Sequence, residues 1–189
     1  MNFNIIFSGV GGQGVLSLAA IISKAASDLG LYAKQSEIHG MSQRGGAVMA
    51  TLRLSDRPIE SILIPEGQGN MLISVEPLES IRNLPMLAKD AVVITATAPF
   101  KNIPDYPNLE KLLAAIRTLP KAVLVNADQI AMEAGSARTA NVALVGAAAQ
   151  YLPFEKSTLE NAIAKMFERK GKSIVESNLQ AFRLGGLVK

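Results

Sequence analysis

A short polar segment, SEIHGMSQRGG at residues 36–46, contains the side chains best suited to bind an anion or move a proton. It holds the only histidine of the chain, His39, followed by Gln43 and Arg44. The guanidinium of Arg44 can bind a carboxylate or phosphate through two parallel hydrogen bonds, and an imidazole such as that of His39 titrates near neutral pH. Gly45 and Gly46 allow a close approach of the backbone to a ligand.

The same residues also permit a structural interpretation. A lone histidine can be the hydrogen-bonded anchor of a loop, and a glycine pair before a strand can simply shape a bend. The sequence offers neither a second histidine nor a partner residue at catalytic spacing. We therefore expect half of an active site on this chain, with the other half on another polypeptide.

A second candidate site is the glycine-rich turn GVGGQG at residues 9–14. Gly9, Gly11 and Gly14 have the GxGxxG spacing and lie between an apolar strand pattern and a helical pattern. Such glycines permit a tight turn and close packing, while the amides of the first helical turn face an anion. Gly12 adds room, and Gln13 offers an amide.

Three interpretations of this turn remain open: an anion site, the plain chain reversal of a Rossmann-like fold, and a contact with a partner. A dinucleotide site also requires an acidic residue about 20 residues further on. Glu37 is near enough in sequence to be considered. Nothing later in the chain resembles a nicotinamide site.

The elements around both segments predict an α/β fold. Residues 1–37 fit one βαβ unit, with strands at 4–8 and 31–37 and a helix that begins at Val15 and stops at Gly30. Residues 47–55 alternate in period two and predict a half-exposed antiparallel or edge strand, with these residues on its apolar face: Val48, Ala50, Leu52 and Leu54.

Later segments continue the alternation of strands and helices. Buried strands are expected at 71–77, 91–97 and 121–127, and helices at 81–90, 128–136, 139–152, 157–171 and 177–186. Asp128 is the expected N-cap of the second of these helices and Gly135 its stop, while Ser157 and Glu160 form a capping-box pattern. The proline-containing segment 99–110 is expected to be an exposed loop.

These patterns predict a single domain over residues 1–189, with a Rossmann-like, open, mostly parallel sheet and helices on both faces. In such a sheet the glycine turn and the polar loop both follow the carboxyl ends of strands. We therefore expect them to share one crevice.

The composition narrows the possible functions. The chain has no cysteine, so it can form no disulfide and hold no cysteine-ligated iron–sulfur cluster or zinc site. The net charge is only +3, and the sequence has neither a basic stripe nor interleaved aromatic residues, so we do not expect a nucleic-acid surface. No apolar run approaches the roughly 18 residues of a membrane helix, and no signal peptide is recognisable, so we expect a cytoplasmic protein. Because 49% of its residues are hydrophobic, we also expect a partner interface.

Three segments resemble the gamma-type (pyruvate/ketoisovalerate oxidoreductase) domain of the 2-oxoacid:ferredoxin oxidoreductases: GVGGQGVLSLAAIIS, SEIHGMSQRGGAVMATLRLS and NVALVGAAAQYLP. The glycine turn and the RGG loop are shared across that superfamily. Its pyruvate and branched-chain members tend to have Tyr-Gly in place of His39 and Gly40. HGMSQRGG is instead similar to the small, beta-type subunits of the indolepyruvate ferredoxin oxidoreductase branch.

The resemblance implies a division of labour. A larger partner subunit would bind thiamine diphosphate and 4Fe-4S clusters, with coenzyme A as co-substrate and ferredoxin as electron acceptor. The substrate would be a small-molecule 2-oxo acid, indolepyruvate or another arylpyruvate. This chain would hold no cofactor or metal itself and would be inactive alone.

His39, Gln43 and Arg44 match the family's loop by position. We expect catalytic roles for them, with Arg44 as the anion clamp and the other two as hydrogen-bonding groups that orient substrate or coenzyme A. We also expect ligand or cofactor contact, or docking to the partner, at a set of matching turn residues: Gly9, Gly11, Gly12, Gln13, Gly14, Gly45 and Gly46. Gly40 and Met41 complete the matching loop.

Two other functions remain open. A stand-alone nucleotide-binding Rossmann reductase would bind NAD(P) or a flavin unaided, and a pure interaction module would tolerate larger residues at positions 11 and 12. Expressed alone, the chain could also form a homodimer through surface meant for its partner.

Overall fold

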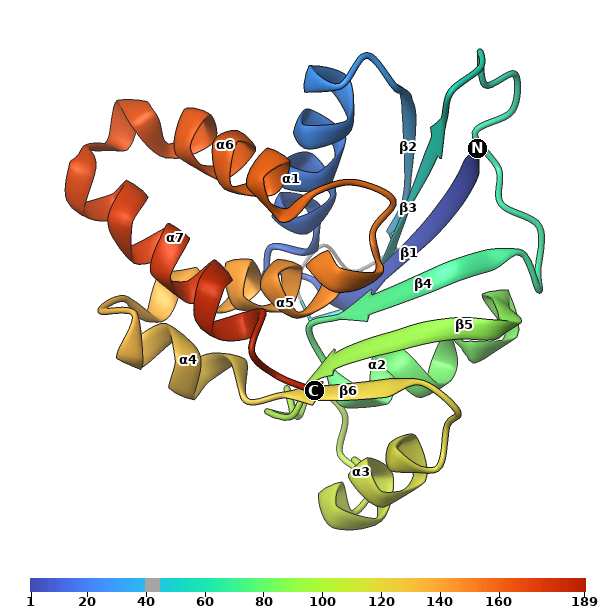
Figure 1. Cartoon of the computed structure of the whole chain (residues 1–189). Coiled ribbons are helices and arrows are strands. Elements are labelled where there is room, and N and C mark those ends of the chain that lie inside the picture. Colours follow the sequence, from blue (N-terminus) through green and yellow to red (C-terminus); the bar gives the residue numbers. More distant parts are fainter. Residues whose placement is uncertain (40–44) are drawn as a thin grey trace.

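A computed structural model describes residues 1–39 and 45–189, without the side chain of His39. Within these residues, one six-stranded sheet has the order β2-β3-β1-β4-β5-β6, with helices on both faces (Figure 1). The strands are β1 (Asn2–Val10), β2 (Tyr32–His39), β3 (Ala47–Ser55), β4 (Gly69–Ser74), β5 (Leu87–Ala96) and β6 (Ala122–Val125). β1, β4, β5 and β6 are parallel neighbours. The predicted open, mostly parallel α/β sheet is confirmed.

The structure of β3 corrects two details of the prediction. Its antiparallel direction is confirmed, and the side chains expected on its apolar face are buried. The expected half-exposure is wrong, because Thr51 and Ser55 on the other face are buried as well. β3 is not an edge strand, however, since it pairs with β1 on one side and β2 on the other. β1 and β2 therefore run in the same direction without being neighbours.

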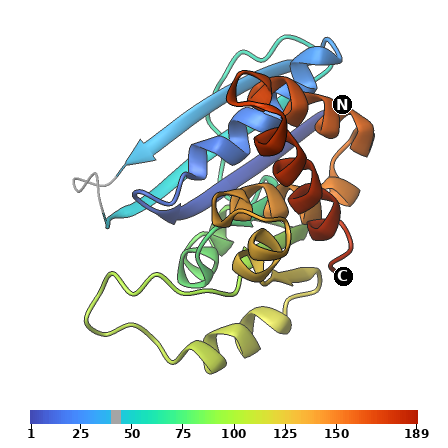
Figure 2. The same cartoon turned by 90° about the vertical axis from the view of Figure 1, so that its left-hand side faces the viewer.

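The larger helical layer covers one face of the sheet (Figures 1 and 2). Its members are α1 (Val15–Asp28), α4 (Ala127–Glu133), α5 (Ala140–Ala148), α6 (Lys156–Phe167) and α7 (Lys172–Gly185). α5 is buried from Val142 to Ala148, as its apolar sequence predicts. The main core lies between this layer and the sheet and includes Phe7, Leu52 and Ile73.

The opposite face of the sheet is covered by a smaller helical layer. α2 (Pro77–Arg82) packs against β1, β4 and β5, and α3 (Leu109–Arg117) contacts β6 and α2. A second core cluster lies here, formed by Ile6, Ile64, Leu72 and Val93. No helix among the described residues is long and apolar enough to cross a membrane.

Several predicted helix boundaries were wrong. In place of a helix at 81–90, the chain forms the end of α2, a 3-10 turn at Leu84–Met86 and the start of β5. Pro85 explains the break, because proline lacks the N–H group that a continuing helix would need. The amphipathic helix α3 was not expected, and α7 begins before the predicted residue 177.

Two predicted caps were also wrong. Asn126 caps α4, since its side chain accepts a hydrogen bond from the Gln129 amide, and Asp128 lies in the first turn. α6 begins at Lys156, so Ser157 lies inside that helix without a capping role. The carboxylate of Glu160, its expected capping partner, pairs with Arg183 of α7. The stop at Gly135 is consistent with its φ of 87°.

Candidate functional site

The glycine turn and the Gly45–Gly46 bend meet at the edge of the sheet where β1 ends and β3 begins. The Gly11 amide donates to the Gly46 carbonyl at 2.8 Å, and the Gly45 amide donates to the Gly11 carbonyl at 3.3 Å. The expected proximity of turn and loop is confirmed for this described part of the loop. Gly40, Met41, Gln43, Arg44 and the side chain of His39 lie outside the described residues.

The glycines of the turn meet different geometric needs. A Cβ atom at Gly9 would lie 2.2 Å from Val75 Cγ2, so a larger residue would clash with the Val75 side chain, just after β4. Gly14 is the N-cap of α1 and has a φ of 73°, which L side chains rarely adopt. Gly12 is exposed in the turn. These needs explain the glycine spacing without a ligand. In the first turn of α1, the Ser17 amide donates to the Gly14 carbonyl at 3.0 Å.

The amide of Gln13 is engaged within the chain. Its Oε1 accepts from the Val10 amide at 2.8 Å, and its Nε2 donates to the Val75 carbonyl at 3.4 Å. Gln13 therefore connects the ends of β1 and β4 beneath the turn, which gives it a structural role whatever ligand the turn receives.

Asn141, at the start of α5, holds the same turn from the helical layer. Its Nδ2 lies 2.9 Å from the Gln13 carbonyl, 3.1 Å from the Gly14 carbonyl and 3.3 Å from Ser17 Oγ. The N-terminus of α1 is thereby fixed against α5.

A hollow of about 350 Å³ opens beside Gln13, at the carboxyl ends of β4, β5 and β6. Its walls are mainly apolar, and its polar lining consists of Gln13, Asp128, Arg138 and Asn141. A second hollow of about 270 Å³ is lined by Gly11, Gly12 and Val48 among others. Ligands of open α/β sheets bind at this edge, so both hollows are suitably placed for a ligand.

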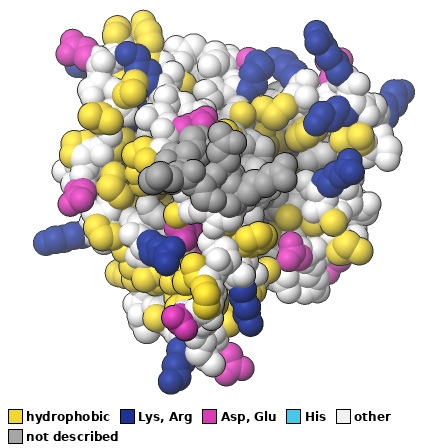
Figure 3. All heavy atoms as spheres, turned by 180° about the vertical axis from the view of Figure 1, so that it is seen from behind, with side chains coloured by type: hydrophobic (Ala, Val, Ile, Leu, Met, Phe, Trp, Pro, Cys, Tyr) yellow, Lys and Arg dark blue, Asp and Glu magenta, His cyan; other side chains and the backbone are white. Residues whose placement is uncertain are grey.

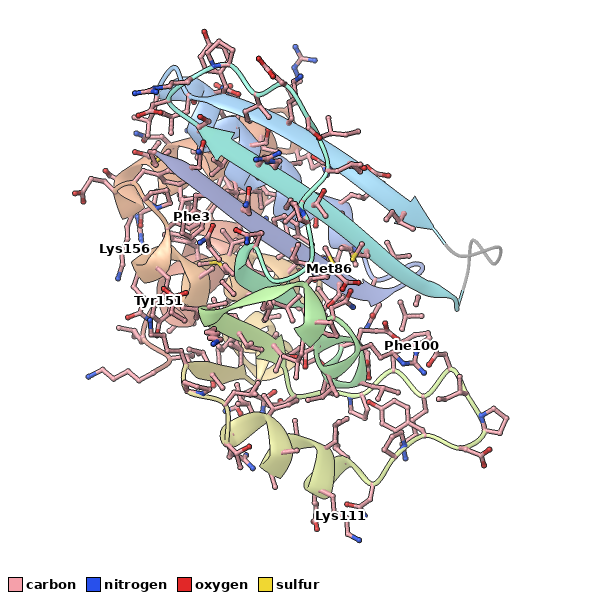
Figure 4. All side chains as sticks on the ribbon, turned by 90° about the vertical axis from the view of Figure 1, so that its right-hand side faces the viewer. Phe3, Met86, Phe100, Lys111, Tyr151 and Lys156 are labelled. Atoms are coloured by element: carbon pink, nitrogen blue, oxygen red, sulfur yellow. The ribbon has the colours of Figure 1, made fainter. Side chains whose placement is uncertain are left out.

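A third segment, residues 97–108, completes this edge. Asn102 Nδ2 donates to the Gly45 carbonyl at 2.7 Å, and the buried Glu76 carboxylate accepts from the Phe100 amide and the Tyr106 hydroxyl. Figure 4 shows Phe100 near the start of β3. We call the Gly9–Gly14 turn, the Gly45–Gly46 bend and the 97–108 segment together the rim.

Two titratable groups near Glu76 have shifted pKa values. Burial, together with the hydrogen bond to Glu76, raises the pKa of the Tyr106 hydroxyl, so this group keeps the proton that it donates. Burial also raises the pKa of the Glu79 carboxyl, although Arg82 pairs with it at 2.6 Å. Within the described ranges, no group of three or more His, Cys, Asp or Glu residues could hold a metal ion.

The residues predicted from the sequence to form the site did not include Glu76, Asn102, Tyr106 or Asn141. Glu76 directly follows an apolar strand pattern and precedes a proline, which is a recognisable site for a helix cap. Asn141 is the only strongly polar residue in the apolar run ANVALVGAAA. Nothing local distinguishes Asn102 or Tyr106, because their partners lie far away in the sequence.

Comparison with known proteins adds the family context. Residues 4–187 match the family described as pyruvate ferredoxin/flavodoxin oxidoreductase. The chain is 38% identical to the indolepyruvate oxidoreductase subunit IorB of Archaeoglobus fulgidus, over 98% of this chain and 94% of that protein. It is 30% identical to the pyruvate/ketoisovalerate oxidoreductases common subunit gamma of Pyrococcus abyssi, over 95% of this chain and 92% of that protein.

Solved structures share the fold. The pyruvate oxidoreductase subunit PORC of Thermotoga maritima superposes with a TM-score of 0.76 at 21% identity, over 100% of this chain and 97% of that one. The 2-oxoglutarate:ferredoxin oxidoreductase of Magnetococcus marinus, solved with 2-oxoglutarate, coenzyme A and succinyl-CoA bound, also gives a TM-score of 0.76. Its identity is 20%, over 98% of this chain and 30% of that longer chain.

Proposed function

The chain belongs to the pyruvate ferredoxin/flavodoxin oxidoreductase family and is a small subunit of a 2-oxoacid:ferredoxin oxidoreductase, and we propose that its complex oxidises indolepyruvate or a related aryl 2-oxo acid. A relative named as an indolepyruvate oxidoreductase subunit is 38% identical, whereas one named as a pyruvate/ketoisovalerate subunit is 30% identical. The HGMSQRGG loop supports the same branch.

In this proposal a larger subunit holds thiamine diphosphate and the 4Fe-4S clusters, and passes electrons to ferredoxin. Thiamine diphosphate supplies carbanion stabilisation at the 2-oxo carbon, and coenzyme A accepts the acyl group. The full sequence contains no cysteine, so this chain lacks the thiolates that such clusters require. We propose that this chain binds and orients the substrate or coenzyme A and excludes water from the site.

Exposed apolar residues on the surface of the chain support the proposal that it binds a partner subunit. Ile38, Leu63 and Phe100 are large apolar residues with exposed fractions of 55%, 67% and 44%. Figure 3 shows hydrophobic side chains gathered in patches, with charged ones scattered between them, on the face seen from behind. Such patches on a folded chain are typical of protein contacts.

The observation that carries the site proposal is the backbone pairing of Gly11 with Gly45 and Gly46. It joins the two segments that the sequence marks for chemistry, at the sheet edge where ligands bind. We propose that this edge completes the partner's active site. Arg44, next to Gly45, clamps a carboxylate of the 2-oxo acid or a phosphate of coenzyme A, while His39 and Gln43 orient it. Gly9, Gly11, Gly12, Gly14 and Gly46 seat the ligand, and Gln13 keeps their turn in shape.

The alternative of a stand-alone nucleotide-binding reductase has no support among the relatives. Glu37, the acidic residue considered for a ribose, lies inside β2 opposite Ala50 rather than beyond the end of that strand. We therefore do not propose an NAD(P) or flavin site.

The test is turnover by the chain reconstituted with its larger subunit. We expect Arg44→Ala to lower kcat/KM for indolepyruvate by about 100-fold, because a bidentate hydrogen-bonded ion pair is lost. Arg57→Ala is the matched control, since Arg57 is an exposed arginine outside the rim. Unchanged kinetics with unchanged assembly would remove Arg44 from the site, and turnover by the isolated chain would contradict the division of labour.

A further inference from the structure

The 97–108 segment is fastened to a single buried carboxylate. Glu76 is 1% exposed, and its Oε1 accepts from the Phe100 amide at 3.3 Å and from the Tyr106 hydroxyl. Its Oε2 accepts from the Glu79 amide at 2.9 Å and so caps α2. The chain from Phe100 to Tyr106 is thus closed into a turn on Oε1, and the other oxygen of the same carboxylate, Oε2, is held by the start of α2.

This closed turn reaches the Gly45–Gly46 bend. Asn102, inside the turn, donates to the Gly45 carbonyl at 2.7 Å, while the Gly45 amide donates to Gly11. The bend is therefore fixed through its amide by the glycine turn and through its carbonyl by the 97–108 segment. Phe100 also lines the 350 Å³ hollow, so the same turn sets one wall of that hollow.

We propose that Glu76, Tyr106 and Asn102 are positioning residues for the reaction of the complex. The Glu76 carboxylate fixes the turn at 100–106, and Asn102 then fixes the Gly45 carbonyl, so the rim keeps one geometry before substrate arrives. This inference rests on the proposed function, because it requires the rim to face the substrate.

Physical chemistry favours such an arrangement over a loose loop. A buried carboxylate without donors is costly, so the Phe100 and Tyr106 hydrogen bonds are strongly favoured and hold the segment closed. An ordered wall also removes the entropy cost of fixing the loop at each binding event. Glu76 acts only through these contacts, since both of its oxygen atoms are occupied by donors of the chain itself.

The first test needs no activity. Trypsin can cleave after Lys101, an exposed residue within the closed turn, and cleavage requires the turn to open. We expect Tyr106→Phe, which removes only the hydroxyl, to raise the cleavage rate at this bond by about tenfold, as followed by mass spectrometry. Asp105→Asn is the matched control, because Asp105 is exposed in the same turn. Equal rates for Tyr106→Phe and the unmodified chain would overturn the inference.

The second test uses the reconstituted complex. We expect Tyr106→Phe and Asn102→Ala each to lower kcat for the 2-oxo acid by about tenfold, with KM changing less and assembly unchanged. Because the contacts act in series, the double variant should lose no more than the more affected single variant, whereas independent structural defects would multiply. Multiplied losses would overturn the positioning role, as would unchanged kcat in a variant that trypsin cleaves faster.

The two proposals fail in different ways. If Arg44→Ala abolishes turnover while the opened Tyr106→Phe variant keeps it, the proposed function stands and the positioning role is wrong. If neither variant affects turnover, the rim does not face the substrate, and both the proposed site at the rim and the positioning role are wrong.

Discussion

Glycines are needed for two different physical reasons in two regions of this molecule. Where α5 packs on α7, a Cβ atom at Gly146 would lie 2.0 Å from the Phe182 carbonyl oxygen, and one at Gly185 would lie 2.0 Å from that of Ala143. At the rim, a Cβ atom on Gly45 would meet none of the described residues within 4 Å, but its φ is 77°. A neighbouring backbone requires glycine in the first region, whereas the conformation of the chain itself favours it in the second.

The glycines between α5 and α7 serve the stability of the fold, whereas we assign Gly45 at the rim to function. The α5–α7 contact has no spare room, so it fixes the helical layer that supports the sheet. Around the Gly45 Cβ position the described residues leave open space, on the edge where we place the substrate. Substitutions that respect this distinction should affect the two properties separately.

The largest expected effect on stability is that of Gly146→Ala. The added methyl group meets backbone rather than a flexible side chain, so α5 and α7 must move apart, at a cost of about 3 kcal/mol. Urea unfolding of the isolated chain measures this loss. Gly186→Ala is the control, because its Cβ atom would lie 3.4 Å from the Arg183 carbonyl oxygen, an ordinary contact. Similar losses for both variants would show that the close approach of the helices does not matter.

A smaller loss of stability is expected from Gly45→Ala. The positive φ makes an alanine there unfavourable by about 1–2 kcal/mol, and the bend must adjust. Gly67 has a φ of 74° and equally open surroundings, but it lies outside the rim, so Gly67→Ala introduces the same strain elsewhere. We expect similar unfolding free energies for the two variants and a loss of turnover in the complex for Gly45→Ala alone. Full activity of Gly45→Ala in the complex would contradict the claim that glycine at the rim serves function while glycine between α5 and α7 serves stability.

Local sequence was sufficient where one short segment determines its own structure. The strand, glycine turn and helix around Gly9–Gly14 were predictable because their spacing and periodicity are continuous. The buried face of β3 followed from alternation at Val48 and Leu52, and the burial of α5 followed from its apolar sequence. The proximity of Gly11 and Gly46 was also predictable, because β1 and β2 point the same way whether or not another strand lies between them.

Local sequence was insufficient to predict features that depend on a residue or strand far away in the chain. The insertion of β3 between β1 and β2 depends on pairing along its whole length on both sides, which no short pattern reveals. The role of Glu76 depends on Tyr106, 30 residues further along the chain. Asn102 looked like any polar loop residue, because the acceptor of its hydrogen bond is the carbonyl of Gly45, 57 residues away.

The central claim is that the rim faces the larger subunit and completes its active site. Hydrogen–deuterium exchange of the chain, alone and within the reconstituted complex, tests this claim most directly. We expect slower exchange in the complex at Gly11–Gly14, Gly45–Gly46 and Phe100–Tyr106, with α6 and α7 unchanged, since these helices lie on the opposite side from the 97–108 segment (Figure 2). Protection confined to α6 and α7, with unchanged exchange at the rim, would contradict the account.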